Sequence, residues 1–498
     1  MVMLRYDATG GDDGEGGYVP LRGGSRNFVP RRHTARAILG DVRFKALANG
    51  DPCTLESLNQ TNVSGSSRTV LEIGQDVVFE LMADGLENQS KLLSEQARVV
   101  EVINDSFGCS FELEFLDGIK LDKLSQDANT HFKRQVLSDD ISGGAQHLPP
   151  AYAMLSIELL HYLAGLRLKA DLLEAAGDGT LEGIFRDARR LMSSHGNEFR
   201  DLWYRFNDVI ADIPYDDDAF AAVKWHTDRV LRPHFMGAPV FARSFEKPLG
   251  YPGDYQIMLH AYDSATPVET PTLYDAVLQQ FFSHGFGACI RSRMALAVDA
   301  IHINMEENPS GEDETYEILN VGCGAAVELP SLIQGTAART KSVHIRLLDQ
   351  DDRPLQYAYQ HAAEAISSNR SRCEVTAYNM SFLELYRAGR LTEENDVGLQ
   401  NVVYSLGLLD YFKALRAKRF VEALYTRVKP GGLLIICNVA KTRVGCEWIL
   451  ECLTDWRLEY RTIDHMNALF VDLPDNPKVT IRLEESKQMW VAVVQKPV

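Results

Sequence analysis

Hydrophobic and polar positions change their period along the chain, and these changes divide it into regions. Residues 1–30 are rich in Gly and Asp and show no apolar periodicity, which predicts a flexible tail. Between residues 31 and 120, short runs of alternating apolar and polar positions are separated by turn residues, so we expect a small antiparallel β-barrel. The runs are VRFKAL (42–47), CTLESL (53–58), TVLEIGQDVVFEL (69–81), ARVVEVI (97–103) and CSFELEF (109–115).

From residue 121 to 240 the pattern is helical. Segments 151–175 and 181–211 place apolar residues three and four apart, which predicts two long amphipathic helices. Beyond about residue 315, strand-like apolar runs alternate with helical stretches, the pattern of a doubly wound α/β sheet. The last two runs, KVTIRLEE and MWVAVVQK, have no helical stretch between them and predict an antiparallel C-terminal hairpin. We therefore expect an α/β fold, Rossmann-like over 241–498, after the helical region and the barrel.

Composition and charge narrow the classes of function. The 51 Lys and Arg against 69 Asp and Glu give a net charge of −18, which argues against a general nucleic-acid-binding surface. No apolar run approaches the roughly 20 residues of a membrane span, and the N-terminus lacks the order of a secretory signal. The eight cysteines include no CxxC pair, so we expect neither a metal site nor a disulfide framework. These features predict a cytoplasmic protein.

The strongest candidate site is the segment EILNVGCGAAVELP, residues 317–330. An apolar strand leads into Gly322-Cys323-Gly324, and a helical stretch follows, so the backbone can approach a ligand while amide groups point at it. The second strand closes at Asp349, about 25 residues later, where a carboxylate can accept both hydroxyls of a ribose. Nicotinamide enzymes and methyltransferases both use this pair of features.

Residues 317–440 resemble a class I S-adenosylmethionine-dependent methyltransferase. The motifs are ILNVGCG, the strand-end Asp349, AYNMSF, NVVYSLGLLDYF and VKPGGLLIICNV. The VKPGGLL turn belongs to the methyltransferase pattern and decides against the nicotinamide alternative. The resemblance implies S-adenosylmethionine as the cofactor, held at Gly322, Cys323, Gly324, Glu328, Asp349, Gln350, Asn379, Met380, Tyr404, Ser405 and Gly407.

The resemblance also implies a role for most of these positions. Gly322 and Gly324 would flank the methionine moiety, and Asp349 would hold the ribose. Asn379, where the family usually carries Asp, would face the adenine amino group with Met380 against the ring. The backbone around Tyr404 to Gly407 would line the sulfonium. Glu328 fits an approach to the cofactor amino group and a solvated helix position equally well.

Candidates for the acceptor side lie outside these motifs. The string EKPLGYPGDYQIM (246–258), together with YSLGLLDYF, resembles a bacterial methyltransferase subgroup labelled as extracellular-factor or 3-hydroxypalmitate methyl ester biosynthesis proteins. That label implies carboxyl O-methylation of a hydroxy fatty acid, with an amine acceptor as the alternative. The candidate catalytic residues are Tyr251, Asp254, Tyr255, Asp410 and Tyr411. A structural turn at the first three and a helix cap at Asp410 are the competing explanations.

Three further groups of residues have alternative interpretations. Arg291 and Arg293, ahead of the first motif, fit a carboxylate partner or a solvated helix face. Trp448, Cys452, Trp456 and Tyr460 follow one another at spacings of four and predict one packed helix face, with an acceptor wall as the alternative. Residues 22–36 hold five arginines and no acid.

In that arginine segment, Arg32 and Arg36 form RxxxR, and NVSGSS (62–67) supplies Asn62 and Ser64. This arrangement resembles a PilZ domain, a bacterial receptor for cyclic di-GMP. The resemblance implies that the four residues bind this nucleotide, although Ser67 stands where the family has Gly.

The leading hypothesis is therefore a methyltransferase acting on a small-molecule acceptor. The alternative is a cyclic di-GMP-responsive signalling protein whose methyltransferase fold does not turn over. A nucleic-acid methyltransferase fails on the charge balance and on YSLG, which stands where that class carries Asn-Pro-Pro-Tyr. Whether the chain forms a homodimer is left open.

Overall fold

The chain forms two compact units. The computed structural model describes residues 3–6, 33–34, 44–58, 62–67, 69–83, 90–105, 108–120, 123–124, 126–128, 146–214, 217–249, 251, 253–307, 315–335, 341–369, 372–380 and 397–498. The larger unit comprises residues 1–26, 147–246 and 253–498, and the smaller one comprises 27–146 and 247–252. Residue 240, where a domain boundary was expected, thus lies inside the larger unit. The helices of residues 147–246 share one hydrophobic core with C-terminal segments of the chain.

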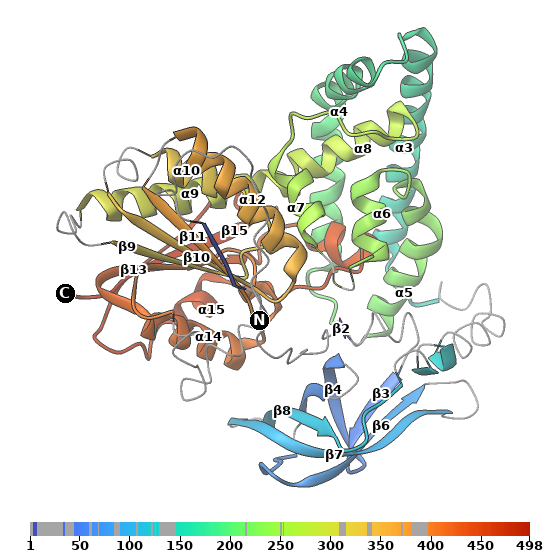
Figure 1. Cartoon of the computed structure of the whole chain (residues 1–498). Coiled ribbons are helices and arrows are strands. Elements are labelled where there is room, and N and C mark those ends of the chain that lie inside the picture. Colours follow the sequence, from blue (N-terminus) through green and yellow to red (C-terminus); the bar gives the residue numbers. More distant parts are fainter. Residues whose placement is uncertain are drawn as a thin grey trace. The chain divides into compact units, whose positions relative to one another are not determined.

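An eight-stranded sheet forms the centre of the larger unit (Figure 1). Its strand order is β1-β11-β10-β9-β12-β13-β15-β14. Strands β9 to β13 run parallel in the order third, second, first, fourth, fifth, which is the order of a Rossmann-like sheet. Their bounds are β9 Tyr316–Val321, β10 Val343–Asp349, β11 Cys373–Asn379, β12 Gln400–Ser405 and β13 Val428–Val439.

These strands are apolar along their length because both faces of the sheet are covered. Successive residues alternate between two cores: Ile318 and Val402 face one, and Leu319 and Val403 face the other. Helices α9 (Phe286–Glu307), α10 (Leu329–Gln334) and α12 (Asp352–Asn369) cover the first face. Helices α14 (Ala414–Thr426) and α15 (Ile463–Ala468) cover the second (Figure 1).

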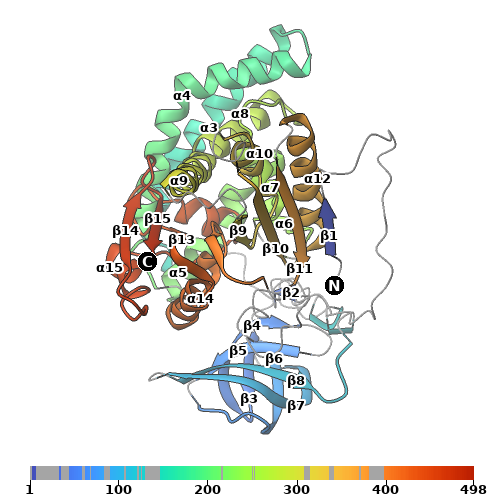
Figure 2. The same cartoon turned by 60° about the vertical axis from the view of Figure 1, so that its left-hand side comes forward.

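The two edges of the sheet are antiparallel. Strand β15 (Met489–Gln495) pairs antiparallel with β13 and with β14 (Lys478–Leu483), which forms one edge. At the other edge β1 (Met3–Tyr6) pairs antiparallel with β11 (Figure 2). The structure differs here from the expectation of a tail without secondary structure, because these four residues find free backbone groups on β11 to pair with.

The helical part of the larger unit carries the two predicted long helices, which are confirmed to within a residue: α3 spans Pro150–Ala176 and α4 spans Leu181–Ile210. Shorter helical segments follow; they are α5 (Asp218–His226), a π-helical turn η2 (Thr227–Leu231), a 3₁₀ turn η3 (Arg232–His234), α6 (Pro239–Glu246), α7 (Tyr255–Tyr262) and α8 (Leu273–His284). Thr180 caps α4 by accepting from the Gly183 amide at 3.0 Å. No helix among the described residues is long and apolar enough to cross a membrane.

One predicted helix is wrong. Only a π-helical turn, η6 (Trp448–Leu453), forms in the segment 446–460, and Asp455 then adopts a positive φ of 53°. Trp448 stacks on Phe206 of α4, with ring centroids 4.2 Å apart. Trp456 lies beyond the turn and packs against Phe286 instead. The spacing of four therefore does not describe one face, because the helix ends before its second half.

Antiparallel strands make up most of the smaller unit. They are β2 (His33–Thr34), β3 (Phe44–Ala48), β4 (Asp51–Leu58), β5 (Asn62–Ser67), β6 (Asp76–Ala83), β7 (Ser90–Asp105) and β8 (Gly108–Phe115). The pairings β4-β3-β6-β7-β8-β5 return to β4, so six strands form a closed ring. Asn49 and Gly50, both at positive φ, form the tight turn between β3 and β4. The hydrophobic core of the smaller unit includes Phe79, Leu81 and Leu113.

Candidate functional site

The turn after β9 is held against the end of β10. The amides of Gly322 and Cys323 both donate to the Leu348 carbonyl, at 2.8 and 3.1 Å. Gly322 and Gly324 have φ of 66° and 53°, a backbone conformation that side chains with a Cβ adopt at a cost. A Cβ on Gly322 would lie 3.3 Å from the Leu408 side chain. The glycines thus let the turn pass close to the end of β12.

Asp349 ends β10 directly beside this turn. Its Oδ2 accepts from the Gly324 amide at 2.9 Å, and its Oδ1 accepts from the Asp351 amide at 3.0 Å. Burial raises the pKa of the carboxyl to about 6, against these two hydrogen bonds, which lower it. An ionised carboxylate has about four acceptor positions, so its backbone contacts leave part of its acceptor capacity for a ligand. We call Gly322, Gly324 and Asp349 the glycine–aspartate edge.

The end of β11 adjoins this edge. The Asn379 side-chain amide donates to the Asp349 carbonyl at 3.3 Å, and the Met380 amide donates to the same oxygen at 3.1 Å. The Met380 side chain is buried among apolar residues, and Gln350 is exposed. The Asn379 oxygen accepts no hydrogen bond from any residue that the structure describes, and Met380 chiefly fills core.

A buried carboxyl lies behind the turn. Glu328 is 3% exposed, and its Oε1 accepts from Asn320 at 2.9 Å and from the Tyr404 hydroxyl at 2.8 Å. Burial raises the pKa of Glu328 and also that of Tyr404, well above its usual value. The solvated position considered for Glu328 is therefore wrong: the residue joins the ends of β9 and β12.

The Cys323 side chain is buried, and its Sγ lies 3.5 Å from the Gly324 carbonyl within the turn. It belongs to the core cluster, and burial raises the pKa of its thiol well above the usual value. Only the backbone of this residue is available to a ligand. At the end of β12, Ser405 is buried, and its Oγ has no hydrogen-bond partner among the described residues. Gly407, two residues on, is half-buried.

Asp410 and Tyr411 follow β12 and contact the segment after η6. Asp410 is 4% exposed; its Oδ1 accepts from the Val439 amide at 2.7 Å, and burial raises its pKa to about 6. The Tyr411 hydroxyl accepts from Trp456 Nε1 at 3.1 Å. Asp410 thus ties the end of β12 to β13, and Tyr411 ties it to Trp456.

Gly253 completes this group. With a φ of 66°, it lies so close to Trp456 that an added Cβ would be 2.0 Å from the indole ring. We call Gly253, Asp410, Tyr411 and Trp456 the tryptophan wall. Its members come from three segments that are about 45 to 200 residues apart in sequence, so only the tertiary fold brings them together.

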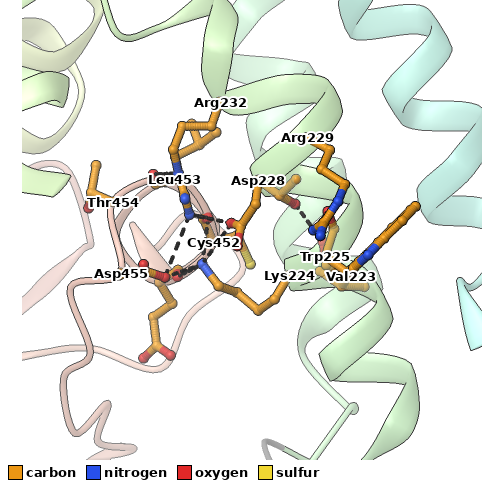
Figure 3. Close-up of polar contacts among 12 residues, drawn as sticks. Val223, Lys224, Trp225, Asp228, Arg229, Arg232, Cys452, Leu453, Thr454 and Asp455 are labelled. Atoms are coloured by element: carbon orange, nitrogen blue, oxygen red, sulfur yellow. Dashed lines mark hydrogen bonds and ion pairs between the residues drawn. The ribbon is translucent and has the colours of Figure 1, made fainter. Parts of the chain in front are cut away.

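Cations of the helical part hold the segment that carries Trp456 (Figure 3). Lys224 Nζ donates to the carbonyls of Glu451 and Cys452, at 3.0 and 2.8 Å, and bonds the Asp455 carboxylate. Arg232 Nε donates to the Leu453 carbonyl at 2.8 Å. The two cations thus satisfy the last carbonyls of η6, as basic side chains do at helix C-termini.

An acid on the same helical segment links the two cations. Asp228 bonds Arg232 and lies 3.6 Å from Lys224 Nζ (Figure 3). The Asp455 side chain is 3% exposed, so both cations neutralise a buried charge. This network fixes the chain one residue before Trp456.

The loop candidates divide between the two units. Asp254 caps α7: its Oδ1 accepts from the amides of Gln256 and Ile257 at 3.0 and 3.2 Å, and Arg243 forms an ion pair with it at 2.8 Å. With no exposed surface, Asp254 has the contacts of a structural cap and not of a group facing substrate. The Tyr255 ring lies 6.0 Å from that of Tyr357 on α12. Tyr251 is half-buried and belongs to the smaller unit.

Of the expected nucleotide-binding residues, Arg32 and Arg36 lie outside the described residues, as does the side chain of Ser64. Asn62 begins β5, and its side-chain amide donates to Glu112 Oε1 at 3.1 Å. Glu112 is 5% exposed. The described part of the predicted motif is therefore engaged within the smaller unit.

Sequence reasoning missed the residues that build the wall from a distance. Lys224 and Arg232 lie in no motif, and Gly253 lies in the string 246–258, whose contact with Trp456 the sequence does not indicate. For Arg293 the sequence leaves a carboxylate partner and a solvated helix face open. The structure buries Arg293, at 5% exposure.

No family model matches the chain, and no curated protein matches it by sequence. Among solved structures, it is similar to a protein of Bordetella parapertussis described as a possible exported protein, at 16% identity and a TM-score of 0.41, over 64% of this chain and 96% of that one. It is also similar to the S-adenosylmethionine-dependent methyltransferase SibL, at 15% identity and a TM-score of 0.32, over 72% of this chain and 98% of that one.

A third similarity is to magnesium protoporphyrin IX methyltransferase of Synechocystis PCC 6803 with bound S-adenosylmethionine, at 13% identity and a TM-score of 0.29, over 42% of this chain and 83% of that one.

Proposed function

We propose that the chain is a class I methyltransferase that moves a methyl group from S-adenosylmethionine to a small-molecule acceptor. One observation carries the proposal: the Gly324 amide donates to Asp349 Oδ2 at 2.9 Å, so a glycine turn and an acid meet at the carboxyl ends of adjacent parallel strands. Ligands of open α/β sheets bind at that edge, where the strand order reverses. Here the reversal lies between β9 and β12.

Several residues would hold the donor in this proposal. Asp349 would accept the ribose hydroxyls with the lone pairs that its two amide contacts leave open. The Asn379 oxygen would accept from the adenine amino group. The turn at Gly322 and Gly324 would lie along the amino-acid end, with Glu328 beneath it. The Rossmann-like order with β15 antiparallel to β13 supports the same assignment.

Methyl transfer is an in-line displacement in which the acceptor atom bonds the methyl carbon while the carbon–sulfur bond breaks. The products are the methylated acceptor and S-adenosylhomocysteine. Most of the catalysis can come from holding the two reactants in line. The end of β12, from Ser405 to Gly407, would line the sulfonium, and the tryptophan wall would limit the space for the acceptor.

The acceptor proposed here is a carboxylic acid such as a hydroxy fatty acid, with an amine as the alternative. An ionised carboxylate is itself the nucleophile and needs no base, whereas an ammonium group must first lose a proton. Asp410, whose pKa burial raises to about 6, is the candidate base for an amine. Tyr411 is the group that would orient either acceptor, since the residue is 42% exposed while its hydroxyl is held by Trp456.

Titration calorimetry of the full chain with S-adenosylhomocysteine tests the donor site. Asp349→Ala should weaken binding by about 1–3 kcal/mol, because the ribose hydroxyls lose their acceptor. Glu364→Ala is the matched control: its carboxylate lies on α12 and is 74% exposed, so affinity should not change. Absence of binding to the wild-type chain, or equal affinities for the Asp349 variant, would reject the proposal.

For the smaller unit we propose a PilZ-like barrel that regulates the enzyme. The closed ring of strands β3 to β8 supports a barrel, and the RxxxR sequence at Arg32 and Arg36 supports an anionic ligand. Titration of the full chain with cyclic di-GMP, alongside Arg32→Ala, tests it; no binding by the wild-type chain rejects the nucleotide.

A further inference from the structure

Arg293 is a buried cation that forms no ion pair with any acid that the structure describes. It lies on α9 and is 5% exposed. Its Nη1 donates to the Leu406 carbonyl at 2.5 Å and lies 3.3 Å from Met489 Sδ. The guanidinium also bonds the hydroxyl of Tyr262. No described carboxylate comes within 4.0 Å of it, and its Nε has no hydrogen-bond partner among the described residues.

A nearby anion would stabilise the buried guanidinium of Arg293. A guanidinium remains charged at any ordinary pH, and a buried charge is costly unless it is paired. Tyr262 supplies no charge, because burial raises its pKa to about 12. The acids whose charges reach Arg293, Glu328 and Asp410, are already bonded by Tyr404 and by the Val439 amide. These acids act on Arg293 only at a distance, so no described carboxylate forms a direct ion pair with it, and its Nε is left without a hydrogen-bond partner among the described residues.

Arg291 shows the contrast on the same helix. Its Nη1 donates to the Ala261 carbonyl at 2.5 Å and its Nη2 donates to the Ser283 carbonyl at 3.0 Å. It is half-buried and joins the end of α7 to the end of α8. Arg291 is thus explained by the fold, whereas Arg293 is not.

The position of Arg293 indicates where its anion would come from. Leu406 and Gly407 directly follow β12, and a Cβ on Gly407 would lie 3.5 Å from Arg293 Nη2. The neighbouring Leu408 side chain lies against Gly322 of the glycine–aspartate edge. Ser405 adds a second buried polar atom without a partner at the same strand end. The guanidinium therefore lies at the carboxyl ends of β9 and β12.

We propose that Arg293 binds the carboxylate of a ligand held at this strand end, through the edge that carries its free Nε. The inference rests on the proposed methyltransferase function and adds to it a residue that selects ligands carrying a carboxylate. Two sources supply this chemistry: the amino-acid carboxylate of the methyl donor and the carboxylate of an acid acceptor. Either gives the planar, two-point contact that guanidinium makes with carboxylates.

A pair of related ligands separates the sources. S-adenosylhomocysteine carries the carboxylate, and 5′-methylthioadenosine has the same adenine, ribose and thioether without the amino-acid end. For Arg293→Gln, we expect S-adenosylhomocysteine to bind about 10- to 100-fold more weakly and 5′-methylthioadenosine to bind within twofold of wild type. Arg291→Gln, from the same helix, should change the ratio of the two affinities by less than twofold.

The acceptor source gives a different result. Both donor analogues would then bind Arg293→Gln as they bind wild type, and 3-hydroxypalmitate would bind the S-adenosylhomocysteine complex at least tenfold more weakly than it binds the wild-type complex. Arg293→Lys keeps the charge but not the two-point contact, so it should lose about three- to tenfold in whichever affinity depends on Arg293. It replaces Arg293→Gln if that variant does not fold.

Unchanged affinities for all three probes in a folded Arg293 variant would overturn the inference and leave the proposed function intact. A wild-type chain that binds neither S-adenosylhomocysteine nor 5′-methylthioadenosine would instead overturn the proposed function, and the inference with it. Thermal unfolding of each variant, measured in parallel, identifies those that fold.

Discussion

The glycine–aspartate edge and the tryptophan wall belong to the same compact unit but are built in opposite ways. The edge needs two adjacent strands and one turn, and Gly324 and Asp349 meet because β9 and β10 pair in parallel. The wall needs a loop before α7, the end of β12 and the segment after η6. It also needs Lys224, more than 220 residues away in sequence from the chain that it holds.

The different construction of the edge and the wall indicates where substitutions should be tolerated. Backbone amides and one carboxylate make the edge, so neighbouring side chains can change as long as the turn keeps its glycines. The wall depends on side-chain fit and on buried charges, so a change at one of its distant supports alters it. If the proposed function holds, a pocket lined by the tryptophan wall can change between proteins while the glycine–aspartate edge stays the same.

The largest effect should come from Gly253→Ala. The new Cβ would lie 2.0 Å from the Trp456 ring, and alanine is strained at a φ of 66°. Overpacking and backbone strain together should cost about 2–4 kcal/mol of stability, measured as a lowered unfolding midpoint.

The matched control for Gly253→Ala is Gly165→Ala in α3. No atom lies within 4 Å of the added Cβ there, so this variant should be neutral or more stable by up to about 1 kcal/mol. Equal unfolding midpoints for the two variants would show that Gly253 does not pack against Trp456.

Lys224→Met should have a smaller effect, about 2 kcal/mol of stability. The change removes one of the two cations that pair with the buried Asp455 carboxylate, and it removes one donor from each of the Glu451 and Cys452 carbonyls. Affinity for S-adenosylhomocysteine should not change, because the edge does not depend on this network.

Lys418→Met provides the comparison for a surface pair. Lys418 and Asp472 are 31% and 62% exposed, and such a pair contributes at most about 1 kcal/mol. Lys224→Met could instead lose affinity for S-adenosylhomocysteine while keeping its unfolding midpoint. The glycine–aspartate edge would then depend on the Lys224 network, contrary to this prediction.

The smallest effect concerns pH at the edge. The pKa of Asp349 in the fold, about 6, lies above the usual value of 3.8, so ionisation costs the folded state free energy as pH rises from about 4 to 6. Asp349→Asn removes this cost. Its stability relative to wild type should therefore increase by about 1 kcal/mol between pH 5 and pH 8.

Thermal unfolding at the two pH values measures this difference, with the exposed Asp352→Asn as a control that should show none. The affinity of the wild-type chain for S-adenosylhomocysteine should meanwhile rise from pH 5 to pH 7.5, because only the ionised carboxylate accepts from both hydroxyls. A flat profile of both quantities would mean that Asp349 is ionised well below pH 5.

Parts of the fold and of the site were predictable because they depend on local pattern. Continuous apolar runs gave the parallel strands, since a strand buried on both faces has no polar side, and the long helices followed from their spacing. The glycine turn and Asp349 followed from their positions at strand ends. Strand β5 was missed because its serines and glycine are typical of a turn, and it forms only by pairing with β4 and β8.

The sequence by itself therefore determined the main strands and helices, the glycine–aspartate edge and the net negative charge of the chain, because each depends on residues close together or on a simple sum. The tertiary structure alone decided that Arg293 is buried with no ion pair among the described residues, that Trp456 leaves the helix face, and that Lys224 holds the chain beside it. The physical reason is that burial and charge pairing depend on which distant segments come into contact. The residues of one segment do not determine those contacts.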